Sequence, residues 1–110
     1  MESEEVKAYV TKADDREIRV KILKDSFGGS LVNIGFVFDN DLSEYTFLTK
    51  DEREKASMFE ALRQLDVYFS GGREWCPSEI FEDLRGSGYI DGTFNKISWS
   101  SPGSYHITVV

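Results

Sequence analysis

Residues 49–72 read TKDEREKASMFEALRQLDVYFSGG, and they determine how the rest of the 110-residue chain can be organised. Thr49, followed three residues later by Glu52, has the spacing of a capping box, which begins many helices. Apolar residues then recur at helical spacing, at Met58, Leu62, Leu65 and Phe69. Gly71 and Gly72 supply the backbone freedom with which helices often end. The sequence therefore predicts one long amphipathic helix that ends at the glycine pair.

A second, shorter helix is expected soon afterwards. Pro77 suits the first turn of a helix, where its missing N–H costs nothing. The apolar face of this helix consists of Ile80, Phe81 and Leu84. Gly86 and Gly88 mark its end. Because the two helices are consecutive, helices and strands do not alternate along this chain.

Alternating apolar and polar residues predict strands on both sides of the helical segment. The expected strands cover residues 6–11, 18–23, 31–38, 95–100 and 105–110. Residues 44–48 form either a further short strand or a lead-in to the first helix. Residues 31–38 are apolar on both faces, which is typical of a central strand. Pro102 and Gly103 suit a type II turn between the last two strands. We expect Ile97 and Trp99 to face Tyr105, Ile107 and Val109 across the core.

These expectations define an α+β fold with one domain over residues 1–110. Three strands, a short fourth strand, two helices and two final strands follow one another along the chain. The predicted architecture is an antiparallel sheet packed against one longer and one short helix.

The net charge of −7 is concentrated in the middle of the chain. Residues 39–91 contain 13 acids and 6 bases, whereas residues 92–110 contain no acid and one base. A negative surface attracts basic partners and repels nucleic acid, because phosphate contacts need clustered lysine and arginine. We therefore expect a basic protein partner and no direct contact with DNA or RNA.

The chain has the sequence features of a cytoplasmic protein. Cys76 is the only cysteine, so an internal disulfide is excluded. The first residues are acidic and lack the apolar run of a secretory signal. No apolar stretch approaches the roughly 20 residues that cross a membrane, and we expect no membrane association.

The residue types that carry chemistry are sparse. Cys76 and His106 would form a nucleophile and base only if the fold brought them together. Residues 39–43 match the start of a calcium loop, D-x-D-x-S. The sixth and twelfth positions, however, hold Glu44 and Lys50 instead of glycine and glutamate. We predict no catalytic residue, no metal and no cofactor.

The acidic segment is the strongest candidate site, because aromatic residues lie among its carboxylates, as in many protein interfaces. The candidate partner-binding residues are Asp39, Asp41, Glu44, Tyr45, Trp75, Glu79, Glu82 and Asp83. Trp75 is either a partner anchor or a plug at the edge of the core. The sheet face with Arg19 and Lys21, or an edge strand, is an alternative contact surface.

The expected function is that of a small acidic, non-enzymatic inhibitor that blocks a basic toxin or nucleic-acid-binding effector. In size, charge and lack of catalytic motifs the chain is similar to toxin immunity and phage anti-defence proteins, an analogy without a shared motif. One alternative is a ligand-binding protein or enzyme that uses Cys76 and His106. Another is an oligomeric adaptor subunit whose edge strands pair with another chain. The inhibitor hypothesis predicts a monomer.

Overall fold

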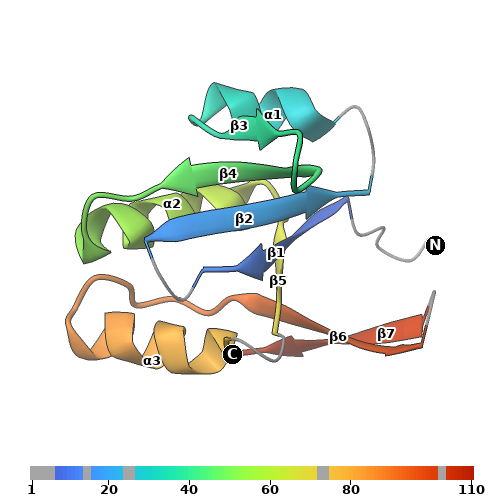
Figure 1. Cartoon of the computed structure of the whole chain (residues 1–110). Coiled ribbons are helices and arrows are strands. Elements are labelled where there is room, and N and C mark those ends of the chain that lie inside the picture. Colours follow the sequence, from blue (N-terminus) through green and yellow to red (C-terminus); the bar gives the residue numbers. More distant parts are fainter. Residues whose placement is uncertain (1–6, 14–15, 24–26, 72–74, 102–103) are drawn as a thin grey trace.

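In a computed structural model, residues 7–13, 16–23, 27–71, 75–101 and 104–110 are described, and they form a mixed seven-stranded sheet with three helices (Figure 1). The elements are β1 (Ala8–Lys12), β2 (Glu17–Ile22), α1 (Gly28–Asn33), β3 (Val37–Asp39), β4 (Glu44–Leu48), α2 (Glu52–Gln64), β5 (Tyr68–Ser70), α3 (Pro77–Gly86), β6 (Asn95–Ser101) and β7 (Ser104–Val109). The strand order in the sheet is β3-β4-β2-β1-β5-β6-β7. The predicted α+β class is confirmed.

The centre of the sheet is parallel, so the expectation of an antiparallel sheet is wrong there. β5 pairs in parallel with β1, where Phe69 lies opposite Val10, and also with β6, where Ser70 lies opposite Ile97. The pairs β1–β2, β2–β4, β3–β4 and β6–β7 are antiparallel. The parallel pairs arise because β5 lies between two helices, so the chain must cross over before and after it.

The predicted long helix wrongly includes the residues of β5, because the segment that ends α2 contains no glycine. Asp66 adopts a positive φ of 64°, and its N–H donates to the Arg63 carbonyl over 3.0 Å. The N–H of Val67 donates to the Leu62 carbonyl over 3.0 Å. These two bonds form a Schellman motif, in which glycine is the usual residue at the position of Asp66. Phe69 therefore belongs to β5, five residues beyond the last helical residue.

The predicted strand over residues 31–38 is also wrong, because most of its length is helix α1 and the turn that follows. Gly35 has a φ of +112°, which favours glycine, and its N–H donates to the Val32 carbonyl. The N–H of Phe36 donates to the Leu31 carbonyl, which completes a second Schellman motif. Only β3 remains as strand, and it lies at the edge of the sheet instead of its centre.

The N-cap residue of α2 is Asp51, which lies two residues after the predicted N-cap, Thr49. The Asp51 carboxylate accepts a hydrogen bond from the Glu54 N–H over 2.8 Å, and the Glu54 carboxylate accepts one from the Lys50 N–H. Thr49 is buried, and its hydroxyl donates to the Arg16 carbonyl over 2.7 Å. Thr49 thus ties β4 to the start of β2 rather than capping the helix.

The other predicted elements are confirmed. α3 begins at Pro77, and it ends in a third Schellman motif in which Gly88 has a φ of +80°. The final hairpin consists of β6 and β7. The predicted turn at residues 102–103 lies outside the described residues.

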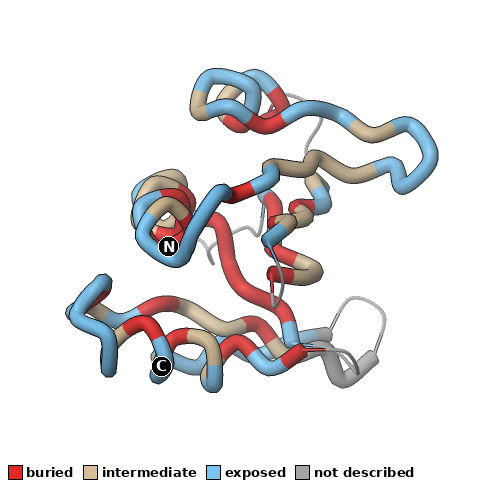
Figure 2. Tube along the Cα trace, turned by 60° about the vertical axis from the view of Figure 1, so that its left-hand side comes forward, coloured by how far each residue is buried: buried red, intermediate tan, exposed pale blue. Residues whose placement is uncertain are grey.

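One face of the sheet carries the core, and helices α1, α2 and α3 pack against it (Figures 1 and 2). Ala8 and Val10 of β1 point into this core, whereas Tyr9 points to the other face and joins a small cluster with Tyr68 and Ile97. The expectation that the final hairpin faces the core is wrong for β7. Its apolar residues Ile107 and Val109 are exposed, because no described element covers that face.

Four phenylalanine rings form the centre of the core, and every pair among them is in contact. Phe59 lies on α2, Phe69 on β5, Phe81 on α3, and Phe94 immediately before β6. The centroids of Phe81 and Phe94 are 4.6 Å apart with the rings stacked, and the other five pairs are edge-on at 5.1–6.3 Å. These geometries are the favourable ones for aromatic rings.

We expect Phe81→Ala to lower the free energy of unfolding by about 3–5 kcal/mol, because it leaves a cavity among three buried rings. Phe38→Ala removes the same side chain from a half-exposed site and should cost clearly less. Denaturant unfolding monitored by circular dichroism measures both values. Equal losses in the two variants would contradict a central role for the ring cluster.

Candidate functional site

The structure divides the eight candidate residues into two separate groups. Asp39, Asp41, Glu44 and Tyr45 lie at the turn between β3 and β4, at one edge of the sheet. Trp75, Glu79, Glu82 and Asp83 lie on or next to α3, which connects β5 to β6 beyond the centre of the sheet. Figure 1 shows the β3–β4 hairpin and α3 at opposite ends of the molecule. The two groups therefore do not form one continuous surface.

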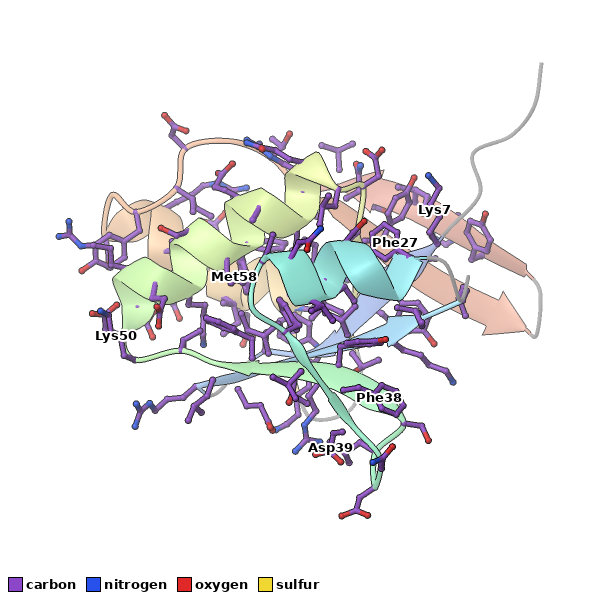
Figure 3. All side chains as sticks on the ribbon, turned by 90° about the horizontal axis from the view of Figure 1, so that it is seen from above. Lys7, Phe27, Phe38, Asp39, Lys50 and Met58 are labelled. Carbon is purple, nitrogen blue, oxygen red and sulfur yellow. The ribbon has the colours of Figure 1, made fainter. Side chains whose placement is uncertain are left out.

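In the hairpin group, two of the three carboxylates stabilise the fold. Asp39 accepts hydrogen bonds from the backbone N–H groups of Asp41 and Leu42 over 2.9 and 3.1 Å. Glu44 accepts one from the Thr11 hydroxyl over 3.1 Å. Figure 3 shows Asp39 and Phe38 at the end of the hairpin that is remote from Met58 on α2. The residues that the structure describes offer no such partner to the Asp41 side chain, which is exposed.

Tyr45 of the same hairpin is half-buried and packs into the fold. Its ring lies edge-on to Phe38, with centroids 5.1 Å apart. Its hydroxyl lies against Gly28 so closely that a Cβ atom at that position would overlap it. A side chain at position 28 would therefore force Tyr45 to shift. This contact joins the start of α1 to β4 and gives Tyr45 a structural role.

Trp75 is a core residue, which corrects its assignment as a partner-binding residue. Its side chain is 5% exposed and belongs to the main apolar cluster. Its indole N–H donates to the Ser70 carbonyl at the end of β5 over 2.9 Å. The hydrogen bond satisfies the one polar atom of the indole, so Trp75 anchors the entry to α3 without needing a partner.

The outer face of α3 carries the remaining acidic group. Phe81 and Leu84 point into the core, so the exposed side chains of Glu79, Glu82 and Asp83 point away from it. Together with Ser78, these three acids line a surface hollow of about 330 Å³. They form a compact acidic surface, which we call the α3 acidic face.

The acids of the α3 acidic face contribute little to folding. Arg85 contacts Glu82 over 3.3 Å, but the Glu82 side chain is 76% exposed, so the pair contributes little. Arg85 is held by the Gly92 and Val110 carbonyls, each 2.9 Å from its Nη2 atom. Glu79 lies in the first helical turn, where a carboxylate interacts favourably with the helix dipole. Within the described residues, Glu79 and Asp83 form no ion pair.

Cys76 occupies a different hollow, on the side of α3 where the helix begins. This hollow has a volume of about 300 Å³ and is lined by Gly71, Trp75, Cys76, Pro77, Lys96, Ile97 and Ser98. The thiol of Cys76 is exposed. His106 lies opposite Ser98 on the neighbouring strand β7. Lys96 and Ser98 carry no local sequence signal for this hollow, because only the parallel pairing of β5 and β6 places them beside Cys76.

The described residues contain neither a metal site nor a membrane-spanning helix. Among them, no three or more histidine, cysteine, aspartate or glutamate side chains are grouped so that they could hold a metal ion. Nor does any described helix have the length and apolar character needed to cross a membrane. Comparison with known proteins finds no matching family model, and no curated protein or solved structure is significantly similar to the chain.

The different roles of two neighbouring aspartates can be tested by stability measurements. We expect Asp39→Ala to lower the free energy of unfolding by about 1 kcal/mol, because two backbone N–H groups lose their acceptor. Asp41→Ala should leave it unchanged, because this side chain makes no such bond. Thermal and denaturant unfolding of both variants measures the difference. A loss of stability in Asp41→Ala equal to that in Asp39→Ala would contradict the assignment.

Proposed function

We propose that the protein is a small acidic inhibitor that binds and blocks a basic, nucleic-acid-acting protein, and that the α3 acidic face is its contact surface. The observation that carries this proposal is the hollow lined by Glu79, Glu82 and Asp83. Three exposed carboxylates around one depression present negative charge at the spacing of neighbouring side chains on a helix. Such a surface suits lysine and arginine side chains that otherwise contact phosphate groups.

The distribution of roles among the eight candidate residues supports this choice. Asp39, Glu44, Tyr45 and Trp75 form contacts that stabilise the fold. Only Asp41 and the three acids of α3 have no comparable structural role. Of these, the α3 acids are grouped on one regular element, whose position is fixed by Phe81 and Leu84 in the core. A rigid, preorganised surface loses less entropy on binding than a mobile one.

A second candidate function rests on the hollow at Cys76. Its lining combines a thiol, the Lys96 ammonium and the Ser98 hydroxyl, and His106 lies one strand away. This combination favours binding of a small ligand, or an enzyme that uses Cys76 and His106. It takes second place because three of these groups border the hollow but His106 is not among its lining residues.

The first proposal is tested by removing charge from the α3 acidic face. We expect Glu79→Gln, Glu82→Gln and Asp83→Asn together to weaken binding to the basic partner and to flatten the dependence of its association rate on salt. The partner is found by affinity capture from the source cells with the wild-type protein. Its association is then measured by surface plasmon resonance at several salt concentrations.

A matched control removes the same number of charges elsewhere on the surface. Glu52→Gln, Asp66→Asn and Asp91→Asn act at exposed positions outside α3. This triple variant should keep most of the affinity, because attraction by net charge alone is weak at physiological salt. The proposal fails if both triple variants bind equally well, or if the captured protein is acidic and has no activity on nucleic acid.

The second candidate is tested by Cys76→Ala combined with His106→Ala. If the hollow at Cys76 carries the function, this double variant should lose the effect of the wild-type gene in its host, while the variant of the α3 acidic face keeps it. The readout is complementation of a deletion strain by each variant. Full complementation by the Cys76 and His106 double variant rejects the second candidate.

A further inference from the structure

The two outer strands of the sheet differ sharply in how they are protected. β3 has three residues and ends at Asp39, so it offers a short edge next to a carboxylate. β7 has six residues, Ser104–Val109, without aspartate, glutamate, lysine, arginine or proline. Short length, charge and proline are the usual means of preventing an edge strand from pairing with another chain. β7 has none of them.

The backbone of β7 presents hydrogen-bonding groups at its outer edge. Phe94 and Val110 exchange both backbone hydrogen bonds over 2.9 Å. In an antiparallel pair, hydrogen-bonded and non-hydrogen-bonded positions alternate, so the N–H and C=O groups of Val109 and Ile107 point away from β6. No described element lies beyond β7 in the sheet.

The side chains of these two residues are also exposed and apolar. Val109 is 64% exposed and Ile107 is 36% exposed, and their spacing of two places them on the same face of the strand. Pairing with another strand would satisfy the outward backbone groups and place the partner's side chains beside these two. The kind of partner then depends on the charge around β7.

A second copy of this chain can occupy this edge, because it brings the same unprotected strand and no acid in its final hairpin. Residues 92–110 contain no acid and one base, whereas residues 39–91 contain 13 acids. Two copies with a net charge of −7 each repel one another over most of their surface. The final hairpin belongs to the segment without acids, and its outer strand is the one with an unprotected edge.

We propose that β7 pairs with β7 of a second copy, in antiparallel orientation, with Ile107 opposite the partner's Ile107. This arrangement is symmetric, because the same residues contribute from both copies, and it joins two sheets into one. It departs from the expectation of a monomer, and it uses no residue of the α3 acidic face. Stable protein interfaces bury about 1,200–2,000 Å² of surface, and a single strand pair buries less than that. We therefore expect the dimer to dissociate on dilution.

Salt separates this contact from binding of a basic partner. The two copies carry like charges, so screening tightens the dimer. We expect the dissociation constant of the dimer to decrease when the salt concentration is raised from about 0.01 M to about 0.1 M, because the Debye length shortens from about 30 to about 10 Å. Binding of a basic partner through the α3 acidic face weakens over the same range.

The test is sedimentation velocity of the full chain and two variants over a dilution series. The wild-type protein should show a concentration-dependent dimer. Val109→Lys should raise its dissociation constant about tenfold or more, because each dimer buries two added charges. Val37→Lys is the matched control, since Val37 is 66% exposed on the other edge strand, and it should dimerise like the wild type. Circular dichroism checks that both variants are folded.

Amide hydrogen exchange provides a measurement that needs no variant. Exchange at Ile107 and Val109 should slow as the protein concentration rises, while exchange at Val37 of β3 stays the same. The proposal is overturned if the wild-type protein is a monomer at every salt concentration up to about 1 mM protein. It is equally overturned if Val37→Lys disrupts the dimer and Val109→Lys does not.

Discussion

Contact among four phenylalanine rings holds together segments that are far apart in the sequence. Phe59, Phe69, Phe81 and Phe94 come from α2, β5, α3 and the segment before β6, and each touches the other three. The ring of Phe81 fixes which side of α3 faces the core. The acids on the opposite side of α3 are exposed for that reason. The position of the candidate contact surface therefore follows from the packing of apolar side chains.

The parts of the fold that local patterns could predict are the ones that glycine, proline and alternation mark clearly. Apolar and polar residues alternate along the strands of the β6–β7 hairpin, and α3 has Pro77 at its start and Gly88 just after its end. The end of α2 was missed, because Asp66 takes the left-handed conformation that glycine usually takes. Because the helix end at Asp66 was not recognised, β5 was not predicted, and neither was the parallel pairing at the centre of the sheet. α1 was not predicted because its second half belongs to the largely apolar residues 31–38, and a short apolar segment is equally typical of a strand and of a buried helix.

The sequence indicates which residues belong to the candidate site, but not which of them lie on the same surface. Counting charges located the acids in residues 39–91, and the structure places all of the candidate acids in exposed or half-exposed positions. The division into two groups depends on the strand order, which no local pattern encodes. The structural roles of Asp39 and Glu44 depend on hydrogen bonds to the hairpin backbone and to Thr11. Lys96 and Ser98 became neighbours of Cys76 only through the pairing of β5 with β6.

The parallel pairing of β1 with β5 also constrains the order in which the chain can fold. β1 lies near the start of the chain, yet its partner β5 follows β2, α1, β3, β4 and α2. β1 and β2 can form a hairpin early, because they are close together in the sequence, but the second edge of β1 must wait for residues 68–70. Long-range pairing of this kind slows folding, since a large loop must close before any contact repays its entropy. During synthesis, the hairpin would therefore keep one unpaired edge until more than half of the chain has left the ribosome.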